Sequence, residues 1–335
     1  MPVHFQPRSL RLAGTDRNGC PTAGTNTAGQ GLTNRPLNSV AIPPMKSLLL
    51  PIFLVLAVGL MAGCDASRGG ELSNSQPAVP ASTNGTAGST ARTATLNSVP
   101  VVHVFVALCD NVNQGIVPVS ASLGNGDNPA TNLYWGAAFG VRTFFSKSKE
   151  WELVSRVENP RASVLERLIF KHRQREVFMV ADAYRGKEIA QATWDFLQAA
   201  SGHPGETVRV KSGTKTVEFN TDGSAELVAY VGHNGLMDFA LHSMPQAMDE
   251  RHRQAIILAC ISKKYFAAPL KGTGASPLLW TTNLMAPEAY ILSAAIDGWM
   301  KKETDEEVRV RAAKAYNTYQ HCGLKAANNL FATGF

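Results

Sequence analysis

The sequence has none of the short motifs that identify several common enzyme classes. It contains no HExxH, no paired CxxC and no GxSxG, which argues against the zinc proteases and serine hydrolases that carry those motifs. Gly124-Asn125-Gly126 lacks the third glycine of a dinucleotide fingerprint, and Gly186-Lys187 lacks the upstream glycine and the following Ser or Thr of a P-loop. We therefore expect neither a cofactor nor a metal ion.

The apolar run at residues 48–61 is shorter than the roughly 20 residues that a membrane-spanning helix needs. Residues 1–44 show no apolar period, and we interpret them as a disordered or untranslated extension. Met45 and Lys46 then begin a signal-peptide pattern that ends in LMAGC at residues 60–64. This end resembles the lipobox of bacterial lipoproteins. It predicts that residues 45–63 are a cleaved signal peptide and that Cys64 becomes the lipidated N-terminus.

The predicted lipid on Cys64 implies a protein of the bacterial cell envelope that is membrane-anchored and faces the periplasm. Asp65 resembles the residue that retains enterobacterial lipoproteins in the inner membrane. Residues 64–98 are rich in Ser, Thr, Ala, Gly, Asn and Pro, a composition typical of a flexible tether. Loss of residues 1–63 lowers the net charge from +6 to about +2. We therefore expect contact with the lipid membrane through Cys64, and no nucleic-acid partner.

The chain has only five cysteines, and three of them follow the tether: Cys109, Cys260 and Cys322. An odd number of cysteines in an oxidising compartment leaves at least one thiol unpaired, and an unpaired thiol is a candidate reactive group. A Cys109–Cys322 disulfide would leave Cys260 free, although the sequence alone does not establish the pairing.

Beyond residue 99, short β-branched or aromatic runs alternate with longer helical stretches. The runs are residues 101–108, 177–181, 227–231, 255–259 and 277–281. Because each is almost entirely apolar, we expect strands covered on both faces by crossover helices. Helices are predicted at 187–200, after Cys260, from Pro287 toward Trp299, and at 305–321. Residues 132–145 are predicted to be helical, and residues 150–175 to hold a small antiparallel pair. The expected fold is a single α/β domain over 99–335 with a mostly parallel sheet.

Polar residues follow each of these apolar runs, where an open parallel sheet binds its ligands. The runs end in Cys109-Asp110-Asn111, in Asp182, in GHNG at 232–235, in Cys260, and in Thr282-Asn283. Neighbouring strands lie about 4.8 Å apart, so His233 and Cys260 can approach each other. An imidazole beside a thiol can activate it as a nucleophile. The N–H groups of Asn234 and Gly235, with that of Cys260, could form an oxyanion hole.

The runs AYVGHNG (229–235) and IILAC (256–260) resemble the caspase-like cysteine peptidases, which include caspases, legumain, clostripain and the gingipains. In that family a strand ending in His-Gly supplies the base, and a following strand ending in Cys supplies the nucleophile. The resemblance covers roughly residues 100–330 and implies a three-layer sandwich, with His233 as the base and Cys260 as the nucleophile. Asn234 stands where the family has glycine.

The expected substrate pocket is formed by Asp110, Asn111, Trp280 and Thr282, and Asp110 could select a basic side chain of a peptide or protein substrate. In the residue-by-residue interpretation, Asp110, Asp182 and Asp238 are turn or cap residues, and Trp280 is a core aromatic. Two alternatives to a cysteine peptidase or amidase stay open. One is an inactive caspase-like domain that binds a protein or an envelope component. The other is a structural lipoprotein in which the cysteine and histidine have no chemical role.

Overall fold

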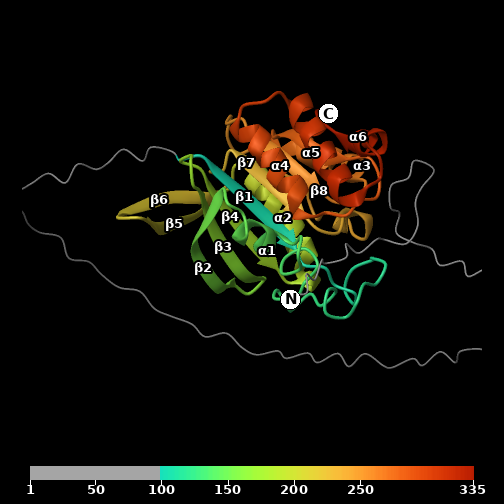
Figure 1. The fold of residues 1–335 in the computed structure, drawn as a ribbon, viewed down its shortest axis with the longest axis horizontal. Helices are drawn as coiled ribbons and strands as arrows, with labels where there is room; N and C mark the ends of the chain where they lie inside the picture. Colours follow the sequence, from blue (N-terminus) through green and yellow to red (C-terminus); the bar gives the residue numbers. More distant parts are fainter. Residues whose placement is uncertain (1–98) are drawn as a thin grey trace, which may run out of the picture. The chain divides into compact units, whose positions relative to one another are not determined.

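The computed structural model describes residues 99–335. The extension at residues 1–44, the predicted signal peptide and the whole tether, with Cys64 and Asp65, lie outside the described residues. The described part is built on an eight-stranded sheet in the order β10-β9-β8-β7-β1-β4-β3-β2 (Figure 1). Its strands are β1 (Val101–Ala107), β2 (Trp151–Arg161), β3 (Val164–His172), β4 (Phe178–Tyr184), β7 (Leu227–Val231), β8 (Gln254–Leu258), β9 (Ser276–Thr281) and β10 (Phe331–Ala332).

The central strands β9, β8, β7, β1 and β4 are parallel to one another. At the edges, β10 pairs antiparallel with β9, β3 pairs antiparallel with β4, and β2 pairs antiparallel with β3. The helices are α1 (Val141–Ser146), α2 (Ile189–Ser201), α3 (Ser262–Thr273), α4 (Ala289–Met300), α5 (Asp305–Gln320) and α6 (Leu324–Leu330). Two single 3₁₀ turns, η1 (Gly186–Glu188) and η2 (Gly235–Met237), follow β4 and β7. The expected α/β fold with a mostly parallel sheet is confirmed.

Two hydrophobic cores, one on each face of the sheet, make a three-layer sandwich. In β1, Val102, Val104 and Val106 belong to the core that contains residues of α4 and α5. Phe105 and Ala107 belong to the core that contains residues of α2 and α3. This alternation follows from the two-residue period of a strand, and it explains why the strands are apolar at nearly every position.

The five predicted parallel strands all form, with ends shifted by three residues or fewer, and the antiparallel pair is β2 with β3. The predicted helix over 132–145 is wrong, because only Val141–Ser146 is helical. The side chain of Asn132 accepts hydrogen bonds from the N–H groups of Cys109 (3.0 Å) and Tyr134 (3.2 Å). Such side-chain bonds compete with helix formation and hold the segment in turns.

A second, two-stranded sheet, which was not predicted, is made by β5 (Pro204–Ser212) and β6 (Lys215–Asp222). The turn of this hairpin contains Gly213 at φ 60°, a backbone conformation that glycine adopts without steric cost. The hairpin contributes Val210 and Phe219 to the core on the α2 face. The Phe219 ring lies against Phe178 of β4, with 5.0 Å between their centroids.

Asp182 was expected at the end of a strand. It lies instead within β4, at the centre of a buried charge network. Arg167 of β3 donates to both Asp182 oxygens, at 2.6 and 2.7 Å. The His103 Nε2 atom lies 3.2 Å from Asp182, and its Nδ1 atom lies 3.2 Å from the carboxylate of Asp222. Arg167 also bonds Glu206 of β5 at 2.8 Å. The network therefore ties the β5–β6 hairpin to the sheet.

Burial opposes the charged forms in this network, and the partners reverse that effect. Desolvation alone would lower the pKa of His103, but hydrogen bonds and charges of Asp182 and Asp222 raise it above its ordinary value. Desolvation would raise the pKa of Asp182, but Arg167 and His103 hold it far below its usual range. Removal of one partner would leave a buried charge unpaired and would destabilise the fold.

Candidate functional site

The ends of β7 and β8 bring His233 and Cys260 to one cavity. The two strands are parallel neighbours whose last paired residues are Val231 and Leu258. His233 and Cys260 each follow two positions later in the chain. Both side chains line a cavity of about 190 Å³ at the C-terminal edge of the sheet. This edge is where open parallel sheets bind their ligands.

His233 is held by a carboxylate from its own loop. Its Nε2 atom lies 2.7 Å from Oδ2 of Asp238, and the imidazole is 8% exposed. A carboxylate only accepts hydrogen bonds, so this contact places a proton on Nε2 and leaves Nδ1 as the acceptor. Asp238 also accepts the N–H of Gly115 at 3.1 Å, which connects the histidine loop to the loop after β1. Asp238 was expected to be a turn or cap residue, and its contact with His233 was not predicted.

The backbone around His233 depends on two glycines. Gly232 has φ 152°, and a Cβ atom there would lie 2.8 Å from the carbonyl oxygen of Ala107. A Cβ atom on Gly235 would lie 2.5 Å from the ring of Phe239. A side chain at Gly232 would therefore displace the loop, and one at Gly235 would displace the Phe239 ring.

Asn234, which replaces the family's glycine, links the histidine loop to the cysteine loop. It is fully buried, and its Nδ2 atom donates to the main-chain carbonyl of Cys260 at 2.6 Å. Its Oδ1 atom is buried without a hydrogen-bond partner among the described residues. The bond fixes the position of Cys260 relative to the loop that carries His233.

Cys260 stands on a sharp turn between β8 and α3. The next residue, Ile261, has φ 50°, which is strained for a β-branched side chain. The N–H of Ile261 donates to the carbonyl of Asn283 at 3.0 Å, and α3 begins at Ser262. The predicted helix after Cys260 is therefore present, and its N-terminus, the positive end of its dipole, is close in sequence to the thiol.

The sulfur of Cys260 contacts the main chain of Met285, in the loop between β9 and α4. It accepts the Met285 N–H at 3.4 Å and lies 3.6 Å from the Met285 carbonyl. Burial raises the pKa of the Cys260 thiol, and the Met285 N–H partly offsets that rise. Within residues 99–335, His233 bonds Asp238, and no hydrogen bond joins it to the sulfur.

A second thiol, Cys109, lies in the same cavity at the end of β1. Burial raises its pKa to about 12, and Tyr134, which also lines the cavity, forms a hydrogen bond with it. Cys109, Cys260 and Cys322 are all free, so the Cys109–Cys322 disulfide considered from the sequence is not formed. Cys260 is the least buried of the three.

Asp110 and Asn111 lie beside the cavity but outside its lining. The Asp110 carboxylate accepts the N–H groups of Val112 (2.9 Å) and Asn113 (3.1 Å), and also the side-chain amide of Asn113 (2.8 Å). Asn111 makes two side-chain bonds to the main chain of Val119, at 2.8 and 3.0 Å. Both residues shape the loop after β1, and the structure does not place the Asp110 carboxylate where it would meet a substrate.

Trp280 and Thr282, also expected in the pocket, serve the packing of β9. Trp280 is fully buried in the core on the α2 face, with its ring centroid 5.5 Å from that of Phe335. The Thr282 hydroxyl donates to the carbonyl of Asn329 at 2.7 Å, at the end of α6. Residues 284–288, which follow β9 in the chain, line the cavity instead.

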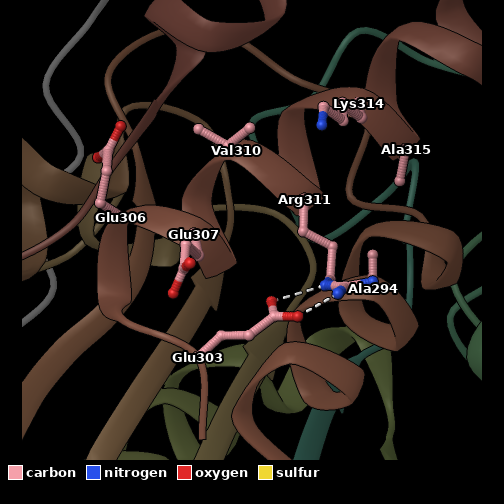
Figure 2. A pocket seen from close by; sticks show the side chains of 8 residues that line it. All are labelled: Ala294, Glu303, Glu306, Glu307, Val310, Arg311, Lys314 and Ala315. Carbon is pink, nitrogen blue, oxygen red and sulfur yellow. Dashed lines mark hydrogen bonds and ion pairs between the residues drawn. The ribbon is translucent and has the colours of Figure 1, made fainter. Parts of the chain in front are cut away.

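A larger hollow of about 570 Å³ lies along α5, away from these strand ends (Figure 2). Figure 2 shows the Arg311 guanidinium bonded to both oxygens of Glu303. The Glu307 carboxylate also has a hydrogen-bond partner, because it accepts the N–H of Thr304 at 2.8 Å in the capping box of α5. These charged groups stabilise the helix, and they bring no nucleophile to the hollow.

Within residues 99–335, no group of three or more His, Cys, Asp or Glu side chains is arranged to hold a metal ion. In the same part of the chain, no helix has the length and apolar character to cross a bilayer. Comparisons with protein-family models, curated proteins and solved structures found no match to the chain. The site must therefore be judged from its own geometry.

Proposed function

We propose that residues 99–335 form a caspase-like cysteine peptidase or amidase domain, with Cys260 as the nucleophile and His233 as the base. The observation that carries this proposal is that the two side chains, from neighbouring parallel strands, line one cavity, while Asp238 binds the histidine. The strained turn at Ile261 supports it, because strain of this kind concentrates at active sites.

The reaction begins when His233 Nδ1 takes the proton from the Cys260 thiol as the sulfur attacks the substrate carbonyl. The carbonyl oxygen becomes an oxyanion, for which the N–H groups of Asn234, Gly235 and Cys260 are the donors. When the C–N bond breaks, the imidazolium gives its proton to the leaving amine. Water then attacks the thioester, His233 again takes a proton, and the acid product leaves with the free thiol restored.

Asp238 orients the imidazole and stabilises its charged form in both steps. Its side chain is 36% exposed, so solvent weakens its interaction with His233. We therefore give Asp238 a smaller share of catalysis than His233. The raised pKa of Cys260 fits a thiol that is deprotonated only when substrate is bound.

Hydrolysis of a library of internally quenched peptides by the purified full chain tests this function. Cys260→Ala should abolish turnover, and His233→Ala should reduce it by roughly 10²- to 10⁴-fold, the usual contribution of a positioned base. Asp238→Asn should cause a smaller loss. Turnover that persists in Cys260→Ala would refute the assignment of the nucleophile.

A catalytically inactive binding domain is the second candidate, and one observation favours it. The Cys260 sulfur is held by Met285 in a buried position that raises its pKa. Specific capture of a peptide from the library, without cleavage and without dependence on His233, would support this candidate.

We further propose that the domain is held at the bacterial envelope by a lipid on Cys64, facing the periplasm. The proposal rests on the signal-peptide pattern and on the LMAGC segment alone. Expression in bacteria that incorporate a labelled fatty acid tests it. The label should enter the wild-type chain and leave Cys64→Ser unlabelled, and the variant should lose membrane association. Equal labelling of both proteins would contradict the anchor.

A further inference from the structure

The cavity beside Cys260 has mostly apolar walls. Nine of its sixteen lining residues are apolar, and four of the others are glycines or cysteines. The apolar residues come from the loop after β1, the loop after β7 and the segment after β9. Val117 and Met237, two of the lining residues, are 50% and 40% exposed, so the apolar lining continues to the molecular surface. Half-exposed apolar side chains at a cavity often mark a binding site.

Three carboxylates lie near the cavity. Asp238 is bonded to His233 and Gly115, and the other two, Asp110 and Glu288, are engaged by their own neighbours. The oxygens of Asp110 accept bonds from its own turn, as described above. Glu288 does line the cavity, but its carboxyl group is bonded by Gln320 of α5 at 2.9 Å and by the hydroxyl of Tyr290. Gln320 and Tyr290 do not line the cavity, so the Glu288 carboxyl group is bonded by residues outside the lining.

Glu288 has no cationic partner among these contacts, and burial raises the pKa of its carboxyl group. A cationic substrate group would lose its hydration in this cavity without a free carboxylate to replace it. An apolar group has no such hydration to lose, and it would displace water from the apolar walls of the cavity.

The size of the cavity also limits the occupant. At about 190 Å³ it is smaller than the roughly 300–1,000 Å³ of sites that enclose a drug-sized ligand. It has room for one side chain or a short acyl group beside the thiol. We propose that it is the subsite for an uncharged, apolar side chain next to the carbonyl that Cys260 attacks. This inference rests on the proposed function and replaces the basic specificity expected from Asp110.

Alkylation of Cys260 by three chloroacetamides tests the inference without requiring catalysis. The reagents carry an isobutyl, a 4-aminobutyl or a 3-carboxypropyl group, and each rate is divided by the rate of the same reagent with free cysteine. Mass spectrometry of the full chain assigns the modified residue. The isobutyl reagent should react with Cys260 about 10-fold faster or more than either charged reagent, as expected for one apolar group in a fitted pocket.

Two substitutions sharpen the result. Glu288→Gln should leave the order of the three rates unchanged, because the carboxyl group does not select the ligand. Met237→Asp should reduce the preference for the isobutyl reagent. Met248→Asp is the matched control, since Met248 is 57% exposed and does not line the cavity, and its preference should equal that of the wild type.

A faster reaction with the aminobutyl reagent, lost in Glu288→Gln, would overturn the inference in favour of a cation site. Equal rates for the three reagents, or no reaction at Cys260, would also overturn it. Failure of the proposed function gives a different result, in which peptides are not hydrolysed but the isobutyl preference remains.

Discussion

Replacing Arg167 by methionine should strongly destabilise the domain. Asp182 is fully buried, and Arg167 supplies both of its shortest hydrogen bonds. The variant keeps the buried carboxylate but leaves it with His103 and, at 3.4 Å, Arg161. Breaking a buried ion pair in this way typically costs about 3–5 kcal/mol. For a domain of this size each kcal/mol lowers Tm by roughly 2–4 °C, so we expect a fall of about 6–20 °C.

Differential scanning calorimetry of the full chain measures this change, with urea unfolding as the second method. Arg209→Met is the matched control, because Arg209 lies on β5 and pairs with Glu218 at an exposed position. Exposed ion pairs contribute little, so the control should keep the wild-type Tm within error. Equal small shifts in the two variants would refute the view that the buried network holds the hairpin to the sheet.

Two further predictions concern titration and thiol accessibility. Because the folded-state pKa of His103 is raised, its contribution to stability is complete below about pH 6.5 and is lost as pH rises through the raised value. The urea-derived free energy of unfolding should therefore fall as pH rises above 6.5 in the wild type and fall less in His103→Gln, whereas parallel profiles would contradict this. Iodoacetamide at pH 8 should modify Cys260 before Cys109 and Cys322, since Cys109 is fully buried and its pKa is raised to about 12. Peptide mapping that finds Cys109 modified first would disprove this order.

The parallel part of the sheet could be predicted because its strands are covered on both faces and are therefore apolar almost without interruption. The hairpin of β5 and β6 was missed, since its strands are polar on their exposed face, as in the Lys215–Asp222 segment. Its signal was the Gly213-Thr214 turn between two alternating runs. The false helix over 132–145 had apolar residues at suitable spacing, but Asn132 forms tertiary bonds that no local pattern reveals.

The proximity of His233 and Cys260 to one cavity could be predicted from the sequence, because strand ends meet at one edge of a parallel sheet. The hydrogen-bond partners of these two residues could not be predicted. Asp238 reaches His233 through a 3₁₀ turn, and Met285 reaches the sulfur from a loop 25 residues away. Asp110 follows a strand as the rule requires, but its short side chain bonds its own turn. The walls of the cavity therefore depend on loop conformations that only the folded chain defines.

The most direct test of the dyad is acylation of Cys260 by p-nitrophenyl acetate, followed by intact-mass spectrometry of the full chain. One acetyl group should form, mapped to Cys260, and it should form at least about 100-fold more slowly in His233→Ala, because the base must remove the thiol proton. Circular dichroism of the variant controls for its folding. Acetylation of Cys260 at the wild-type rate in correctly folded His233→Ala would contradict the proposed role of the histidine.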